Sequence, residues 1–124
     1  MMRATARQLL GRKGEELAKR HLEGQGYRIL EQNYRCSAGE MDIVAQDGEY
    51  LAFVEVRTRR GEEYGTPEES IRSTKQARLI QVALTYLQER ALDNVDWRID
   101  VVAVEMASNG RLLRLDLLKN AVSG

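Results

Sequence analysis

The segment "GEMDIVAQDGEYLAFVEVRTR", residues 39–59, decides the fold because it predicts two strands joined by a tight turn. Residues 41–46 and 49–57 are rich in the apolar and β-branched side chains that favour strands. Asp47-Gly48 between them is a typical two-residue hairpin turn. We therefore expect the two strands to be antiparallel neighbours, with Gln46 paired with Glu49.

Three charged residues interrupt these otherwise apolar strands. Glu55 and Arg57 are two positions apart, so their side chains share one face of the strand. In the predicted pairing Asp42 faces Phe53. Asp42 then lies diagonally beside Glu55, at the roughly 7–8 Å at which two side chains can hold one ion between them.

Two neighbouring carboxylates on a sheet repel each other unless a proton, a cationic side chain or a metal ion compensates. Magnesium prefers oxygen ligands, and a bound ion can polarise a phosphodiester and activate a water molecule. A cation near the phosphorus, Arg57 or Lys75, would then stabilise negative charge. The simpler alternative is an ordinary ion pair between Glu55 and Arg57, with Asp42 only flanking a turn.

The rest of the chain predicts two helices and three more strands. Small and apolar residues recur every four positions over residues 6–23, which indicates a first helix. A short turn at 66–71 and a longer helix over 73–91 follow the hairpin. The periodicity of this helix predicts a buried face of Ala77, Ile80, Leu84, Leu87 and Ala91. Strands are expected at 27–34, at 97–105 and, after an Asn109-Gly110 turn, at 111–119.

This order predicts an α/β or α+β fold in which helices flank a mixed central sheet. A crossover helix between the third and fourth strands makes those two strands parallel. A terminal strand is added after the fourth. A chain of 124 residues is expected to form a single domain spanning residues 1–124.

Composition narrows the function classes only slightly. Nineteen basic residues balance nineteen acidic ones, so no global field favours nucleic acid or a membrane surface. Cys36 is the only cysteine, which excludes an internal disulfide and an all-cysteine zinc site. No apolar run approaches the roughly 18 residues of a membrane span, so we expect a cytoplasmic protein without a membrane partner.

The distribution of charge is more informative. Residues 36–56 hold five acidic and no basic residues, whereas residues 1–35 hold eight basic and four acidic ones. Residues 57–78 hold six basic and four acidic ones. An acidic island between basic segments is typical of a metal site whose rims contact phosphates, although solvated helix faces are the commoner fate of basic residues.

Several motifs, in the same order, resemble the bacterial YraN family of predicted endonuclease-like proteins. That family is similar to archaeal Holliday-junction resolvases and to the restriction-endonuclease-like superfamily. The segments that carry the resemblance are "GRKGEELAKRHLEGQGYRILEQNYRCSAGEMDIVAQDGEYLAFVEVRTR" (11–59), "YGTPEESIRSTKQARL" (64–79) and "RIDVVAVE" (98–105).

The resemblance implies a helix, three strands, a helix and a strand, with a metal site on the sheet. Asp42 and Glu55 match the metal-binding acids of the superfamily, and Glu15 matches a helix-borne glutamate that completes the metal shell directly or through water. Lys75 matches a basic position on the second helix, and Gln76 beside it is a weaker candidate. The implied cofactor is magnesium, with manganese as an alternative.

Arg57 departs from the family pattern, because the superfamily has lysine at this position of its E-x-K motif. An arginine cannot accept a proton at ordinary pH, but it can clamp a phosphate.

The leading hypothesis rests on Asp42, Glu55 and the flanking basic segments. It is a magnesium-dependent endonuclease that cuts branched or structured DNA, and we expect a homodimer. A non-catalytic nucleic-acid-binding module and a protein-interaction domain are the alternatives.

Overall fold

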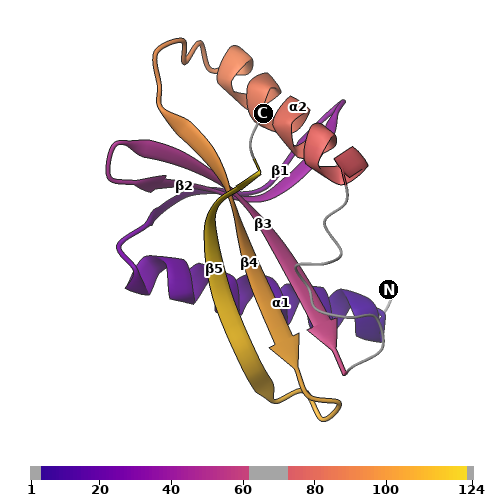
Figure 1. The fold of residues 1–124 in the computed structure, drawn as a ribbon. Helices are drawn as coiled ribbons and strands as arrows, with labels where there is room; N and C mark the ends of the chain where they lie inside the picture. Colours follow the sequence, from indigo (N-terminus) through magenta and orange to yellow (C-terminus); the bar gives the residue numbers. More distant parts are fainter. Residues whose placement is uncertain (1–3, 62–72, 123–124) are drawn as a thin grey trace.

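The computed structural model describes residues 4–61 and 73–122, and it has the predicted α+β architecture (Figure 1). The predicted turn at 66–71 lies outside the described residues. Within the described ranges no helix has the length and apolar character needed to cross a lipid bilayer. The elements in chain order are α1 (Ala6–Gly24), β1 (Arg28–Cys36), β2 (Gly39–Asp47), β3 (Tyr50–Arg60), α2 (Ser73–Glu89), β4 (Trp97–Met106) and β5 (Leu112–Val122).

The five strands form one mixed sheet in the order β1-β2-β3-β4-β5. All neighbours are antiparallel except β3 and β4, which run parallel from the Leu51–Trp97 pair to the Arg60–Met106 pair. This confirms the parallel pairing expected from a crossover helix, because α2 connects these two strands.

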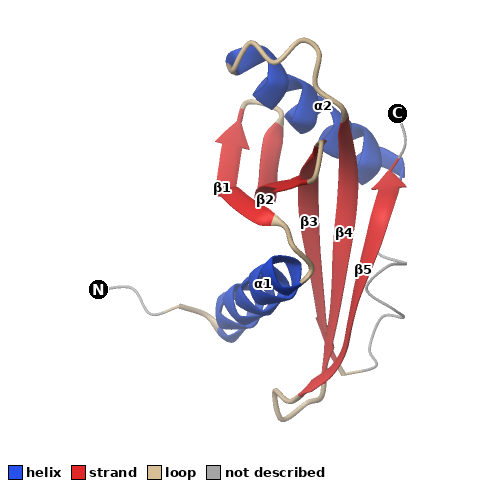
Figure 2. Ribbon diagram, turned by 90° about the vertical axis from the view of Figure 1, so that its left-hand side faces the viewer, coloured by secondary structure: helices blue, strands red, loops and turns tan. Residues whose placement is uncertain are grey.

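The two helices cover opposite faces of the sheet (Figures 1 and 2). On one face α2 packs over Phe53, whose ring makes edge-to-face contacts with Tyr86 at 5.4 Å and Trp97 at 5.9 Å between centroids. On the other face α1 buries Ala18 and Leu22 against the opposite side of the same strands. Alternation along each strand therefore supplies two separate hydrophobic cores.

Helix α1 begins at a capping box, in which the Thr5 side chain and Gln8 exchange hydrogen bonds with each other's backbone N–H groups. It crosses β3 at Gly14. A Cβ atom at this position would lie 2.0 Å from Thr58 Oγ1, so only glycine permits the approach. This close crossing fixes the height of the next residue, Glu15, above the sheet.

The β2–β3 pairing differs from the prediction by two residues. Asp47 pairs with Tyr50 and Val44 with Phe53, so the predicted Gln46–Glu49 pair is wrong. The turn consists of Gly48 and Glu49, because Gly48 adopts a φ of 60° and Asp47 remains in the strand. A shift of two keeps Asp42, Val44 and Glu55 on the same side of the β2–β3 pair, as predicted.

The predicted buried face of the second helix is wrong in part: Leu87 is buried and Ile80 packs partly buried against the core, but the other predicted residues do not face it. The buried residues of α2 are Leu79, Val82, Ala83, Tyr86 and Leu87, whereas Ala77 is exposed and Leu84 is 43% exposed. The helix carries two apolar stripes, and the one that contains the larger Tyr86 contacts Phe53. The helix ends at Glu89, and Ala91 lies beyond it in a left-handed conformation with a φ of 51°.

Strand β3 is longer than predicted. The sequence predicted that this strand ends at Arg57, but it continues to Arg60 because β4 provides hydrogen-bond partners along its whole length. Arg57 and Arg59 therefore lie on a rigid extended strand.

Candidate functional site

Asp42 and Glu55 lie next to each other where the β2–β3 ladder ends. Ile43 pairs with Val54, so continuing this register by one residue brings Asp42 opposite Glu55, and their carboxyl groups share a hydrogen bond. Asp42 Oδ2 also accepts a hydrogen bond of 2.7 Å from the Val56 N–H group. The Asp42 side chain thus takes the place of a backbone partner and closes the end of the ladder.

Burial and mutual repulsion favour protons on this pair. Glu55 is only 6% exposed. Burial, followed by the hydrogen bond and charge of Asp42, raises the pKa of Glu55 to about 8, although Lys75 acts in the opposite direction. Burial also raises the pKa of Asp42. At neutral pH the metal-free pair therefore shares a proton.

Lys75, from the first turn of α2, approaches the pair from the helix side. Its Nζ atom lies 3.2 Å from Glu55 Oε2. The contact is an ion pair without hydrogen-bond geometry. Within residues 4–61 and 73–122, Glu55 Oε2 is the only buried side-chain oxygen or nitrogen that has no hydrogen-bond partner. Apart from its ion pair with Lys75, this buried oxygen has no partner that satisfies it, so it can accept a further ligand.

Glu15 reaches the same place from the opposite face of the sheet. Its carboxyl group interacts with that of Asp42 and, more weakly, with the side-chain amide of Asn33. Burial raises the pKa of Glu15, and the nearby charges of Glu40 and Glu55 raise it further. Asp42 is therefore the centre of a row of three carboxyl groups that comes from α1, β2 and β3.

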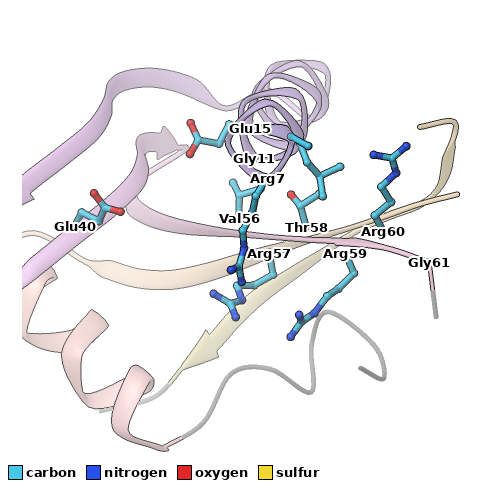
Figure 3. Close-up of a pocket in the computed structure, with 12 residues that line it drawn as sticks. Arg7, Gly11, Glu15, Glu40, Val56, Arg57, Thr58, Arg59, Arg60 and Gly61 are labelled. Carbon is cyan, nitrogen blue, oxygen red and sulfur yellow. The ribbon is translucent and has the colours of Figure 1, made fainter. Parts of the chain in front are cut away.

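An open groove of about 840 Å³ lies beside this row (Figure 3). Glu15 and Glu40 lie at one end of it, and arginines from β3 extend along the rest. Asp42 and Glu55 do not line the groove themselves. They lie directly beneath two residues that do, because the Val56 N–H group and the Glu15 side chain both contact Asp42. The lining residues are Ala6, Arg7, Leu10, Gly11, Glu15, Glu40, Val56, Arg57, Thr58, Arg59, Arg60 and Gly61.

Not all of these arginines have the same role. Arg60 Nε donates a hydrogen bond of 2.8 Å to the Ser108 carbonyl oxygen, which ties the end of β3 to the β4–β5 turn. Arg57 and Arg59 extend from the opposite side of β3 to Arg60 (Figure 3). The groove therefore changes from acidic at one end to basic at the other.

The structure thus brings together Glu15, Asp42, Glu55 and Lys75, and it places Arg57 in the adjoining groove. Gln76 lies half-buried on α2 next to Lys75. Sequence reasoning missed Asn33 and Glu40. Asparagine is a poor strand former, so its position in a predicted strand was a usable signal for Asn33. Glu40 is two residues before Asp42, and this spacing was an equally usable signal.

The donor set fits a hard divalent cation. In the described part of the chain no three histidine, cysteine, aspartate or glutamate side chains form a ready-made metal cage. Magnesium, however, is commonly bound through one or two carboxylates, with water and substrate phosphate as the other ligands. Asp42 and Glu55 provide such a pair, and Glu55 Oε2 is an oxygen that accepts no hydrogen bond.

Sequence comparisons identify the family of this chain. A protein from Pelotomaculum thermopropionicum is 50% identical over 95% of this chain and 98% of the relative, and one from Syntrophus aciditrophicus is 46% identical over 98% and 94%. Both are described only as UPF0102 proteins. The model of the family described as "Uncharacterised protein family UPF0102" matches residues 14–104, which include all four clustered residues. The chain therefore belongs to the UPF0102 family.

Proposed function

We propose that this protein is a magnesium-dependent endonuclease that hydrolyses phosphodiester bonds in branched or otherwise structured DNA. The observation that supports this most strongly is the buried Asp42–Glu55 pair, whose acidity is suppressed and which lies at the acidic end of an arginine-lined groove. The resemblance to YraN-like proteins, Holliday-junction resolvases and the restriction-endonuclease-like superfamily points in the same direction.

In this proposal Asp42 and Glu55 hold the magnesium ion, or manganese in its place, and Glu15 supports it through water. When bound, the ion polarises the scissile phosphate and lowers the pKa of the attacking water. Asp42 is fixed for this task by the Val56 N–H group, so its other oxygen keeps one direction. Glu55 must lose its proton before it can serve as a ligand.

Lys75 and Arg57 together take the place of the lysine that the E-x-K motif has at position 57. An arginine remains protonated, so Arg57 stabilises negative charge on the phosphate but moves no proton. Lys75, whose Nζ atom lies 3.2 Å from Glu55 Oε2, is a second cation beside the acidic pair that can stabilise negative charge on the phosphate. The departure from the E-x-K pattern is then compensated by a lysine supplied from α2.

The proposed partner is DNA. Arg7, Arg57 and Arg59 line the groove next to the acidic pair, and such contacts to phosphates give affinity that falls with salt concentration. We also propose a homodimer, because a four-way junction presents two symmetric strands. The edge strand β5, with Leu112 40% and Leu113 55% exposed, is the proposed contact between copies, which a size measurement in solution tests.

The direct experiment compares cleavage of four-way junction, flap, single-stranded and plain duplex DNA, with and without magnesium. Asp42→Asn is expected to abolish magnesium-dependent cleavage while the protein stays folded. Asp93→Asn is the matched control, since Asp93 is exposed and lies outside the groove. An Asp42→Asn variant that cuts as well as the wild type contradicts the proposal.

A non-catalytic nucleic-acid-binding module is the second candidate, and Arg57 is the feature that favours it. Arg57→Lys restores the motif lysine and separates the two. If Arg57→Lys and the wild type both fail to cut with magnesium or manganese, while salt-sensitive DNA binding persists, the binding module is correct. The absence of both DNA and divalent-ion binding would instead indicate a protein-interaction domain.

A further inference from the structure

Asn33 has an unusual backbone conformation in the middle of a strand. Its φ is 55°, in the left-handed region that strands do not normally use. Asparagine tolerates this region better than most residues, but the conformation still bends β1 sharply. Local strain of this kind concentrates at functional sites, so its position in the fold matters.

Asn33 lies directly across from Asp42. On either side of it Gln32 pairs with Ile43 and Tyr34 pairs with Met41, which leaves Asn33 opposite Asp42. The bend at Asn33 thus coincides with the centre of the carboxyl row.

The bend reverses the faces of the β1–β2 hairpin. Met41 and Ile43 are two residues apart and would share a face in a regular strand. Instead Ile43 packs in the core beneath α1, whereas Met41 and Tyr34 pack in the core beneath α2. The strands therefore rotate at the Asn33–Asp42 step, and the hairpin extends away from the far ends of β3, β4 and β5 (Figures 1 and 2).

This rotation explains how one aspartate contacts partners from both faces. Glu55 belongs to the face of β3 that α2 covers, and Glu15 belongs to α1 on the other face. Asp42 lies at the turning point and interacts with both. The Asn33 side-chain amide also interacts with Glu15, so the same residue bends the strand and contacts the third carboxyl group.

We propose that Asn33 is a positioning residue that assembles the metal-binding row by bending β1 opposite Asp42 and by orienting Glu15 through its side-chain amide. This inference rests on the proposed function, because it assigns Asn33 to the metal site described above. Asn33 also positions Glu15 in the metal-free protein, which can be tested without magnesium.

Two substitutions separate the backbone role from the side-chain role. Asn33→Gly keeps the left-handed conformation without strain but removes the amide. Asn33→Ala removes the amide and disfavours the conformation, so it is expected to lower the melting temperature where Asn33→Gly does not. Asn120→Gly is the matched control, because Asn120 in β5 has a φ of 53° and lies in the separate Asp100 network.

The first measurement uses metal-free protein and carbon-detected NMR of the side-chain carboxyl groups at fixed pH. Asn33→Gly is expected to shift the Glu15 and Asp42 signals, and Asn120→Gly is expected to leave both unchanged. Unchanged Glu15 and Asp42 signals in Asn33→Gly overturn the inference, whatever the protein's activity.

The second measurement is magnesium affinity by calorimetry. Loss of a residue that orients a metal ligand costs roughly 10–100-fold in affinity, so Asn33→Gly is expected to bind magnesium at least tenfold more weakly than Asn120→Gly. Equal affinities overturn the metal-site role of Asn33. If the wild type itself binds no magnesium, the proposed function fails and so does that role, while the NMR result still decides whether Asn33 positions Glu15.

Discussion

Two buried acids on adjacent strands have opposite surroundings. Glu55 on β3 is 6% exposed and Asp100 on β4 is fully buried. Asp100 accepts hydrogen bonds from Arg98 Nε at 2.9 Å, from the Tyr27 hydroxyl at 2.8 Å and from the Asn120 N–H group at 2.9 Å. Glu55 instead faces another carboxyl group, and its Oε2 has an ion pair with Lys75 at 3.2 Å but accepts no hydrogen bond.

The difference separates an acid whose charge the fold satisfies from one that we propose to bind a ligand. Around Asp100 the charges of Asp100 and Asp47 are balanced by Arg98 and Lys119, so this network stabilises the fold without any ligand. Around Glu55 the charge is unbalanced and a proton takes the place of a second cation. Buried groups that the fold leaves unsatisfied are those that a ligand can satisfy.

The largest expected effect is the loss of Asp100. Asp100→Ala removes the fully buried acid partner of the Arg98 guanidinium, whose side chain is 11% exposed. Breaking a buried pair in this way costs about 3–5 kcal/mol of the free energy of unfolding. Urea denaturation measures this cost. A loss below about 1 kcal/mol would remove the contrast with Glu55.

Glu55→Gln is expected to stabilise the metal-free protein at high pH. The folded state keeps its proton up to a pKa of about 8, whereas the unfolded chain releases it near the ordinary value of 4.5, so stability falls as pH rises between these values. The groups facing Glu55 are Asp42, Glu15 and Lys75.

A glutamine side chain has no charge to bury. In the presence of a chelator, Glu55→Gln should therefore be more stable than the wild type at pH 9, by on the order of 2–3 kcal/mol, and equal to it near pH 4. Denaturation curves at the two pH values measure the difference. A wild type whose stability does not depend on pH between these values contradicts the raised pKa.

Gly14→Ala tests how α1 holds its part of the site. The added Cβ lies 2.0 Å from Thr58 Oγ1, so the helix must shift, at a cost of about 1–3 kcal/mol. Gly11→Ala is the matched control, because its Cβ meets nothing within 4 Å and alanine favours the helix by about 0.5–1 kcal/mol. Thermal unfolding of both variants should show effects of opposite sign; equal effects would mean that the crossing is not tight.

The smallest expected effect comes from one hydroxyl of the Asp100 network. Tyr27→Phe removes a donor to Asp100 and an acceptor of Arg98, both within 2.9 Å, and is expected to cost about 1–2 kcal/mol. Tyr50→Phe serves as control, since Tyr50 is 46% exposed and contacts Arg98 through its ring. Equal unfolding midpoints for the two variants would show that the network does not depend on the hydroxyl.

The sequence predicted most of the fold because its signals are local. Each described helix and strand and the parallel β3–β4 pair follow from periodicity and turn residues, and the hairpin turn predicted at Asn109-Gly110 is part of a longer loop over residues 107–111. The buried face of α2 could not be predicted fully, because both stripes of the helix are apolar and the position of Phe53 decides between them. The β2–β3 register could not be predicted either, because Asp47 suits a strand end as well as a turn.

The site was predictable only in part, for a similar reason. Alternation along β3 put Glu55 on the face with Arg57, and the hairpin brought Asp42 beside it. The contact with Glu15 was implied by resemblance alone, because strand alternation says nothing about a helix on the other face. It depends on the left-handed bend at Asn33, a backbone feature with only a weak signal in the sequence.

A single calorimetric experiment decides whether the Asp42–Glu55 pair exchanges its proton for a divalent cation. Magnesium is titrated into the wild type at pH 7 in buffers with different ionisation enthalpies, and the number of protons released is obtained from the heats. One ion should bind and release about one proton, and Asp42→Asn should lose this binding. Binding without proton release, or binding that Asp42→Asn retains, would contradict the assignment of the pair as a metal site.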